Sequence, residues 1–317
     1  MKRTILAILT LAAVLSVFAG CKRNKTVTRN TDGKINVTVT VFPPYDFVRR
    51  IAGDRVNLSM LLPPGTESHS FEPTPKDIIT IQNSDIFIYG GGESDTWIDR
   101  ILTSVNSDRM KTLAMIDEVN AVEEEIVEGM EAEEEDEEDE EAAYDEHVWT
   151  SPRNALLIVR AITNVLCEAD SANADFYRGN SAAYSEGLEQ LDDAFKGVIA
   201  GAKRKTIVFA DRFPLRYFAD AYRLSYFAAF PGCSTETEPS AATVAFLINK
   251  IKAEKIPVVF HIELSNERMA GTISSATGAK KLLFHSCHNL TKKDFDSGLG
   301  YIDLMRRNAE NLREALY

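Results

Sequence analysis

Apolar residues recur with two different periods along this chain, that of a strand and that of a helix, and segments with the two periods alternate. In residues 34–41 every second side chain is apolar, which predicts a strand with one buried face. After Pro43-Pro44 a short amphipathic helix is predicted up to Gly53. A strand, a helix and a strand follow at 56–62, 75–82 and 86–89. Such alternation predicts α/β units on a parallel sheet.

The second half of the chain repeats this alternation after two long helices. Leu, Ile and Val have helical spacing in 152–169, and a second helix over 175–202 would be about 40 Å long. Strands are predicted at 206–209, 224–230, 257–260 and 281–284, and helices at 214–222, 241–252, 266–276 and 299–316. The predicted fold class is therefore α/β, with two lobes, each a mainly parallel sheet flanked by helices, joined by one long rigid helix. The expected boundaries are 34–170 for the N-terminal metal-binding lobe, 171–203 for the linking helix and 204–317 for the C-terminal lobe.

The first residues have the pattern of an export signal. A basic start and an apolar run at 5–18 precede Ala19-Gly20-Cys21. The run is too short for a comfortable membrane span, and small residues before a cysteine are typical of a lipoprotein cleavage site. We expect a signal peptide at 1–20, a lipid on Cys21 and a polar tether at 21–33, which would anchor the protein to the cell membrane. Cleavage without lipidation is the alternative, and both place the protein outside the cytoplasm.

Most of the negative charge is local. The formal net charge is -13, and residues 121–146 contain sixteen Asp and Glu but no Lys or Arg. Dense like charge and low hydrophobicity predict a disordered surface loop. This loop would attract cations weakly, or it would be solvated and only keep the protein soluble. The acidity excludes nucleic acid as an expected partner.

Three cysteines remain besides Cys21. In an extracytoplasmic compartment Cys233 and Cys287 could form a disulfide, whereas Cys167 lies in an apolar helical pattern that favours a buried thiol. Spacing alone does not decide connectivity, so the disulfide stays an open alternative.

The five histidines are the candidate metal ligands, because neutral imidazole binds zinc and its neighbours. His69 lies in the loop after a predicted strand, and His147 directly follows the acidic stretch. His261 and His285 each directly follow a strand of the second half, with His288 close behind. Ligands of open α/β sheets gather at the carboxyl ends of strands, so all five can face one crevice.

Four segments resemble a known family. They are the loop Pro-Pro-Gly-Thr-Glu-Ser-His-Ser-Phe-Glu-Pro at 63–73, His-Val-Trp-Thr-Ser-Pro at 147–152, Glu-Pro-Ser at 238–240 and the ending at 301–316. Together they resemble the substrate-binding lipoproteins of bacterial zinc and manganese ABC importers, in the zinc-type branch. The resemblance implies two α/β lobes bridged by a long helix, one transported ion between them, Zn²⁺ before Mn²⁺, and delivery to a membrane permease. It implies a binding protein and not an enzyme, and we expect a monomer.

The resemblance also implies four ligands, of which His69 and His147 match the first two. The third position falls at Arg212, whose permanently charged guanidinium cannot bind a cation. Neighbouring Asp211 is the tentative substitute, and Arg212 would then orient a carboxylate.

The fourth position falls at or beside His285. His285 and His288 point to opposite faces of a strand but to one side of a helical turn, so both reach one ion only if the chain turns here. His261 and Glu263 are expected to support the ligands rather than bind the ion.

Two other functions are compatible with a metal site. A zinc hydrolase would keep an open coordination position for water, but the chain has no His-Glu-x-x-His motif and Glu263 is the only obvious base near the C-terminal histidines. A surface adhesin would contain a structural or incidental metal. Of the three functions, metal capture for an importer is the one that we favour.

Overall fold

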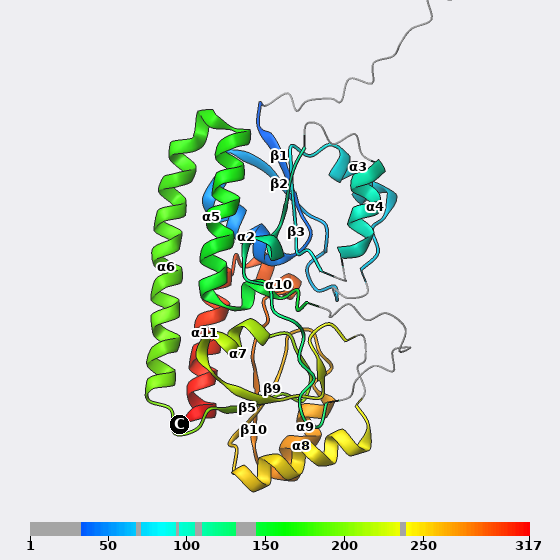
Figure 1. The fold of residues 1–317 in the computed structure, drawn as a ribbon, viewed down its shortest axis with the longest axis vertical. Coiled ribbons are helices and arrows are strands. Elements are labelled where there is room, and N and C mark those ends of the chain that lie inside the picture. The colour runs from blue at the N-terminus through cyan, green and yellow to red at the C-terminus, as the bar shows by residue number, and fades with distance from the viewer. Residues whose placement is uncertain (1–32, 68–70, 93–94, 105–109, 131–143, 235–238) are drawn as a thin grey trace, which may run out of the picture. The chain divides into compact units, whose positions relative to one another are not determined.

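Parallel strands form the centre of both halves of the chain (Figure 1). The computed structural model describes residues 33–67, 71–92, 95–104, 110–130, 144–234 and 239–317. The first half contains a parallel sheet in the order β2-β1-β3-β4. Its strands are β1 (Ile35–Val39), β2 (Val56–Met60), β3 (Ile86–Tyr89) and β4 (Lys111–Ala114), and its helices are α2 (Phe42–Ala52), α3 (Pro75–Gln82) and α4 (Thr96–Ser104). This order places β1 and β3 in the interior of the sheet, where Val37, Val39, Ile86 and Ile88 are buried.

Local signals explain where the helices of the first half begin and end. Pro43 and Pro44 stand in the first turn of α2, and Gly53 ends the helix with a positive φ of 54°, a conformation that glycine adopts at little cost. In α3, Thr74 and Asp77 form a capping box, which satisfies backbone N–H groups at the start of the helix. These ends determine where the chain returns to the sheet.

The second half contains shorter parallel pairs. β5 (Thr206–Val208) pairs with β7 (Ser225–Phe227), β9 (Val258–His261) pairs with β10 (Lys280–Leu283), and β6 (Arg212–Phe213) pairs with β8 (Phe230–Pro231). A parallel bridge between Phe209 and Phe260 links the first two pairs. The helices of this half are α7 (Arg216–Tyr222), α8 (Ala241–Glu254), α9 (Arg268–Thr277), α10 (Lys292–Asp296) and α11 (Tyr301–Leu316).

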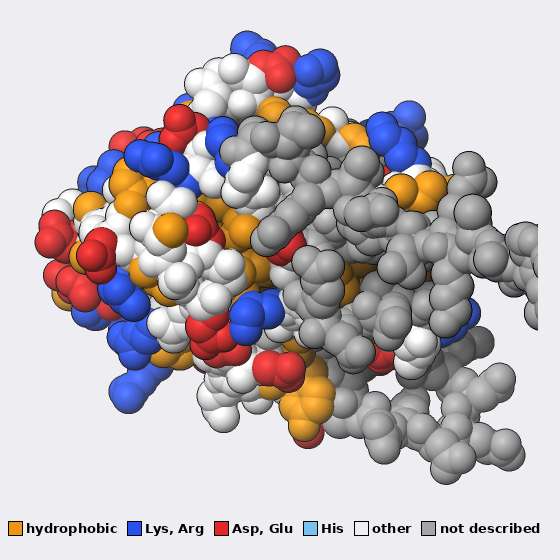
Figure 2. All heavy atoms as spheres, turned by 90° about the horizontal axis from the view of Figure 1, so that it is seen from above, with side chains coloured by type: hydrophobic (Ala, Val, Ile, Leu, Met, Phe, Trp, Pro, Cys, Tyr) orange, Lys and Arg blue, Asp and Glu red, His pale blue; other side chains and the backbone are white. Residues whose placement is uncertain are grey.

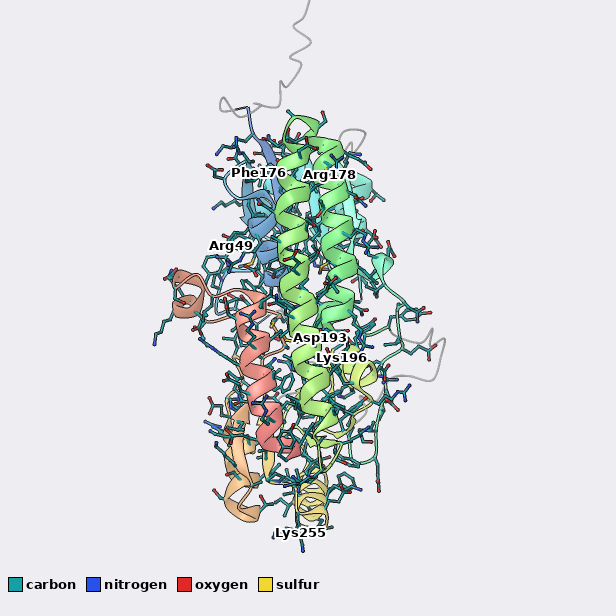
Figure 3. All side chains as sticks on the ribbon, turned by 90° about the vertical axis from the view of Figure 1, so that its left-hand side faces the viewer. Arg49, Phe176, Arg178, Asp193, Lys196 and Lys255 are labelled. Atoms are coloured by element: carbon teal, nitrogen blue, oxygen red, sulfur yellow. The ribbon has the colours of Figure 1, made fainter. Side chains whose placement is uncertain are left out.

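Two long helices pack side by side, and the longer one lies beside both halves. α5 (Pro152–Ala169) and α6 (Ala174–Ala200) pack against each other, and α6 also packs against α2 of the first half and α11 of the second (Figure 1). A Cβ on Gly187 would come within 2.9 Å of the Ile302 side chain, so this glycine permits the close approach of α6 and α11. The outer face of α6 presents Asp193 and Lys196 (Figure 3).

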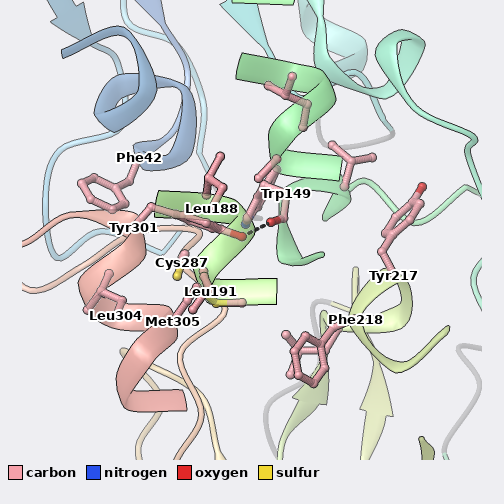
Figure 4. Close-up of a cluster of buried hydrophobic side chains, with 14 of the residues drawn as sticks. Phe42, Trp149, Leu188, Leu191, Tyr217, Phe218, Cys287, Tyr301, Leu304 and Met305 are labelled. Carbon is pink, nitrogen blue, oxygen red and sulfur yellow. Dashed lines mark hydrogen bonds between the residues drawn. The ribbon is translucent and has the colours of Figure 1, made fainter. Parts of the chain in front are cut away.

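The hydrophobic core is continuous between the two halves. One cluster of buried side chains runs from the first sheet through α5 and α6 to the strands of the second half. Trp149 and Tyr301 meet at its centre (Figure 4), where the Tyr301 hydroxyl donates to the Trp149 carbonyl oxygen at 2.6 Å. Because protein interiors are close-packed, a large swing of one half against the other would open this core.

The structure confirms the predicted fold class and most predicted elements. α4, β4, β6 and α10 were not predicted, and the predicted strand at 224–230 is divided into β7 and β8. β4 and α10 are short and mix polar with apolar residues, so they lack the continuous apolar run that indicated β3. The prediction of a long helix was right, and its bounds are Ala174–Ala200.

Part of the acidic stretch differs from the expected disordered loop. Of residues 121–146 the structure describes 121–130 and 144–146, which make defined contacts, and residues 131–143 lie outside the described residues. Glu123 bridges to Tyr144, the Val122 N–H donates to the Tyr217 hydroxyl at 3.3 Å, and Glu128 approaches Lys250 of α8. In Figure 1 this segment runs over the second half toward α8. Apolar side chains within the segment, Val122, Val127 and Met130, pack against the core, which explains why its charge does not prevent folding.

Charges of both signs are interspersed on the described part of the face seen in Figure 2. This mixture agrees with a nearly balanced surface outside the acidic stretch. Among the described residues, no helix combines the length and the hydrophobicity that a membrane span requires.

Candidate metal centre

His147 is a fully buried histidine whose ring is oriented by an aspartate two residues earlier. Asp145 Oδ1 accepts the backbone N–H of His147 at 2.7 Å and contacts the ring Nδ1 at 3.0 Å. An ionised carboxylate only accepts, so Nδ1 bears the proton and the lone pair of the neutral ring lies on Nε2. Carboxylate–histidine pairs of this kind are typical of metal-ligating imidazoles.

Contacts with the second half hold this aspartate in place. The Tyr217 hydroxyl donates to the Asp145 carbonyl oxygen at 2.7 Å, and the Asp145 N–H donates to the Val122 carbonyl at 3.0 Å. The indole N–H of Trp149, two residues after His147, donates to the Ser286 carbonyl at 2.9 Å. His147 is therefore positioned by α7 and by the loop after β10 as well as by its own segment.

The electrostatics around His147 favour positive charge. Burial alone would lower the pKa of this imidazole, but the charge and hydrogen bond of Asp145, together with Glu146 and Glu124, outweigh burial and raise the pKa. The same negative charges would stabilise a divalent cation bound to Nε2. That cation and a proton would compete for the Nε2 lone pair.

His288 brings the second half to the same place. Its ring stands edge to face with the ring of His147, with centroids 5.1 Å apart and planes at 84°. Its backbone N–H donates to Glu263 Oε1 at 3.1 Å and to Ser286 Oγ at 3.2 Å. Glu263 also accepts from the Ser286 N–H at 2.7 Å, so this one buried carboxylate stabilises the turn from Ser286 to His288.

His285 belongs to a different pocket, although the chain does turn between it and His288. Cys287 has a positive φ of 65°, and its N–H donates to His285 Nδ1 at 2.9 Å. A neutral imidazole has one lone pair, and this hydrogen bond uses it. His285 and His261 line a cavity with Asp294 and Arg307, and burial lowers the pKa of His285.

Asp211 and Arg212 have opposite orientations. The Asp211 carboxylate accepts the N–H groups of Arg212 at 3.0 Å and Ile262 at 3.4 Å, and burial raises its pKa. The Arg212 guanidinium lines the same pocket as His147 and His288. Its Nη2 lies 3.1 Å from Glu67 Oε1, and its Nη1 donates to the Ser234 carbonyl at 3.1 Å. The described structure thus directs the positive side chain into the pocket and turns the carboxylate of Asp211 to the backbone.

A second pocket adjoins His288 on the side of the first sheet. Its lining includes Trp149 and two carboxylates, Asp95 and Glu146. Burial, helped by the charge of Glu146, raises the pKa of Asp95 to about 7, although the Gly91 N–H donates to it at 3.0 Å. This pocket has few polar groups besides these acids.

The structure therefore brings two of the predicted ligands together. His147 and His288 line one pocket, while His285, His261 and Asp211 do not line it. His69 and Cys21 lie outside the described residues. Within the described ranges, no group of three or more His, Cys, Asp or Glu side chains is arranged to hold a metal ion.

Sequence reasoning missed several residues that organise the site: Asp145, Glu67, Ser286 and Asn289. Asp145 could have been found, because a carboxylate two residues before a ligand histidine is a simple local signal. It was hidden at the end of a stretch that contains sixteen acidic residues. The other three depend on contacts between distant segments.

The disulfide alternative is not realised in the structure. Among the described residues, Cys167, Cys233 and Cys287 are free cysteines. Cys287 is fully buried near Tyr301 and Leu191 (Figure 4), whereas the Cys233 N–H is bonded to Glu124 Oε1 at 2.8 Å. Burial raises the pKa of both thiols well above the ordinary value, which makes them poor nucleophiles.

Comparison with known proteins identifies the family. Residues 37–315 match the family described as "Zinc-uptake complex component A periplasmic" (ZnuA), and the chain belongs to this family. The chain is 33% identical over 311 residues to the high-affinity zinc uptake system protein ZnuA of Bacillus subtilis, covering 96% of each chain. It is 31% identical over 318 residues to the zinc-binding lipoprotein AdcA of Streptococcus pneumoniae, covering 99% of this chain but only 61% of AdcA.

A solved structure of a similar protein has the same fold. The Zn(II)-bound ZnuA-like domain of Streptococcus pneumoniae AdcA superposes with a TM-score of 0.75 at 30% identity, covering 90% of this chain and 99% of that domain. The present chain therefore spans about three fifths of the AdcA relatives and nearly all of their ZnuA-like domain.

Proposed function

We propose that this chain is an extracytoplasmic binding protein that captures a divalent transition metal, with zinc favoured, and delivers it to the permease of an ABC importer. The observation that carries the proposal is the meeting of His147 and His288 in one pocket, with Asp145 orienting the first ring. Membership in the zinc-uptake family supports it. So do the zinc-binding and zinc-uptake names of the relatives.

The proposed ligands are His69, His147 and His288. Three neutral imidazoles suit Zn²⁺ in a tetrahedral shell, whereas Mn²⁺ prefers sites with more carboxylate. His285 is not among the proposed ligands, because its lone pair accepts the Cys287 N–H. Asp211 is not among them either, because its carboxylate accepts hydrogen bonds from two backbone N–H groups. Glu263 supports His288 through its backbone, and His261 belongs to the neighbouring pocket.

We further propose that residues 34–170 and 204–317 act as two lobes, linked by the helix within 171–203. The continuous core and the contacts of 121–130 with the second half limit their relative movement. Release to a permease would then depend on small shifts of the ligand loops and not on a wide opening.

The location of the protein is proposed from its N-terminal sequence and from its relatives. A signal peptide at 1–20 and a lipid on Cys21 would hold a monomer at the membrane surface, next to its permease. The lipoprotein name of AdcA supports such an anchor. Labelling with radioactive palmitate, in the parent and in Cys21→Ala, tests this point, and equal labelling of both would contradict it.

The central experiment is native mass spectrometry of the purified protein with equal Zn²⁺ and Mn²⁺. We expect one bound Zn²⁺ in the parent and a large loss of binding in His147→Ala. Cells that lack the gene should take up less zinc. A protein that turns over esters or peptides with its zinc would instead be a hydrolase, and unchanged uptake on deletion would favour an adhesin.

A further inference from the structure

The residues that lead to His69 form a tight turn, which is here called the ligand loop (residues 63–67). The Thr66 N–H donates to the Pro63 carbonyl at 3.1 Å, and Gly65 has a positive φ of 87°. Proline at the second position and glycine at the third suit a type II turn. The ligand loop therefore has a defined backbone conformation.

Asn289 holds this backbone from the second half. Its Nδ2 donates to the Pro63 carbonyl and to the Thr66 carbonyl, both at 2.8 Å. Its Oδ1 accepts the Leu290 N–H at 2.8 Å, and the Gly65 N–H donates to the Leu290 carbonyl at 2.8 Å. Asn289 is 2% exposed, so these bonds are shielded from competing water and each would be costly to leave unmade.

Arg212 holds the other end of the ligand loop. Its Nη2 lies 3.1 Å from Glu67 Oε1, and its Nη1 donates a hydrogen bond to the Ser234 carbonyl at 3.1 Å. The Arg212 side chain is only 11% exposed, which makes this ion pair less screened than one at the surface. The arginine that stands at the expected ligand position thus contacts a segment of the first half.

We propose that Asn289 and Arg212 form a clamp that fixes the ligand loop to the second half before the metal arrives. Both are positioning residues and not ligands, and this inference rests on the proposed capture of a metal by His69, His147 and His288. Asn289 directly follows His288 in the sequence. The clamp therefore fixes the position of the ligand loop relative to the backbone of His288. Part of the ordering cost of binding is then removed in advance, which strengthens affinity.

The test uses Asn289→Asp, which keeps the Oδ1 acceptor but places a carboxylate oxygen against two carbonyls. Asn311→Asp is the matched control, because Asn311 Nδ2 makes one exposed hydrogen bond to the Leu283 carbonyl at 2.7 Å. Arg212→Gln and Glu67→Gln, alone and combined, test the ion pair and remain informative if Asn289→Asp folds poorly. The readouts are hydrogen exchange of the peptide covering 61–67 in metal-free protein, the Zn²⁺ Kd, and the Co²⁺ absorption spectrum at saturation.

We expect Asn289→Asp to speed exchange in the ligand loop and to raise the Kd roughly 5- to 30-fold, as for the loss of one or two hydrogen bonds. The Co²⁺ spectrum should not change, and the effects of the two Gln variants should be less than additive. Exchange equal to that of the parent and of Asn311→Asp would overturn the clamp, and a changed spectrum in Glu67→Gln would make Glu67 a ligand. A parent that binds no Zn²⁺ would refute the proposed function, while the exchange data would still decide whether the clamp exists.

Discussion

The rings of His147 and His288 stand edge to face with centroids 5.1 Å apart, although the two residues come from opposite halves of the chain. Each is oriented by its own carboxylate: Asp145 contacts the ring of His147, and Glu263 accepts the backbone N–H of His288. Preorganised ligands of this kind bind a metal without first paying for their own alignment.

The two histidines of the turn after β10 should differ in their effect on zinc binding. His288→Ala should raise the Zn²⁺ Kd by at least about 100-fold, because it removes a donor from the shell. His285→Ala should change the Kd by less than about threefold, since its lone pair already accepts the Cys287 N–H. Competition titrations with a chromogenic chelator measure both, with circular dichroism as the control for folding. Equal losses in the two variants would be incompatible with the proposed ligand set.

Arg212→His should strengthen zinc binding relative to Arg212→Gln. Both variants remove the ion pair with Glu67, but only histidine adds an imidazole at the pocket that contains His147 and His288. A fourth nitrogen donor would complete a tetrahedral shell, and we expect a gain of about tenfold or more over the Gln variant. Isothermal titration calorimetry of the two variants gives the comparison. If both bind alike, position 212 does not reach the ion.

Zinc affinity should fall on acidification, beginning at a higher pH than an ordinary histidine would produce. The pKa of His147 is raised, chiefly by Asp145 acting against burial, and the metal needs the unprotonated ring. Below that pKa each lost pH unit should weaken binding about tenfold for this one proton.

Asp145→Asn is the control for this pH effect. It removes the main cause that raises the pKa of His147, so the midpoint of the affinity–pH curve should shift to lower pH. The other proposed ligands are the same in both proteins, so the difference between the two curves isolates His147. Coincident curves would show that Asp145 does not tune this ring.

Gly129→Ala should loosen the acidic segment from the second half. An added Cβ would overlap the Phe246 ring, and the backbone has a positive φ of 87°, so both space and conformation oppose the change. We expect a loss of about 1–2 kcal/mol in the free energy of unfolding and faster cleavage by a Glu-specific protease. Gly271→Ala on α9 is the matched control, because nothing lies within 4 Å of its added Cβ. Equal behaviour of the two variants would mean that the segment contributes little.

The sequence by itself determined the α/β fold class and the long helix, and it singled out His69 and His147 as candidate ligands, which stay predictions. Those features depend on local information: the alternation in β1, the helical stripe in α5 and the residues that surround His147. It also limited the remaining ligands to a few side chains after the strands of the second half. Short elements such as β4 and α10 were missed because their few residues mix polar and apolar side chains, without the continuous apolar run of β3.

Only the tertiary structure decided which of these side chains meet. His285 and His288 are separated by two residues, yet the positive φ of Cys287 and the hydrogen bonds of Glu263 send them to different pockets. The described part of the acidic segment is held because its apolar side chains pack against the main core and Glu128 pairs with Lys250 of α8, which no local composition reveals. Arg212 holds a turn of the first half through Glu67. A contact between distant segments depends on the whole packed arrangement, and the pattern of residues around each position does not contain it.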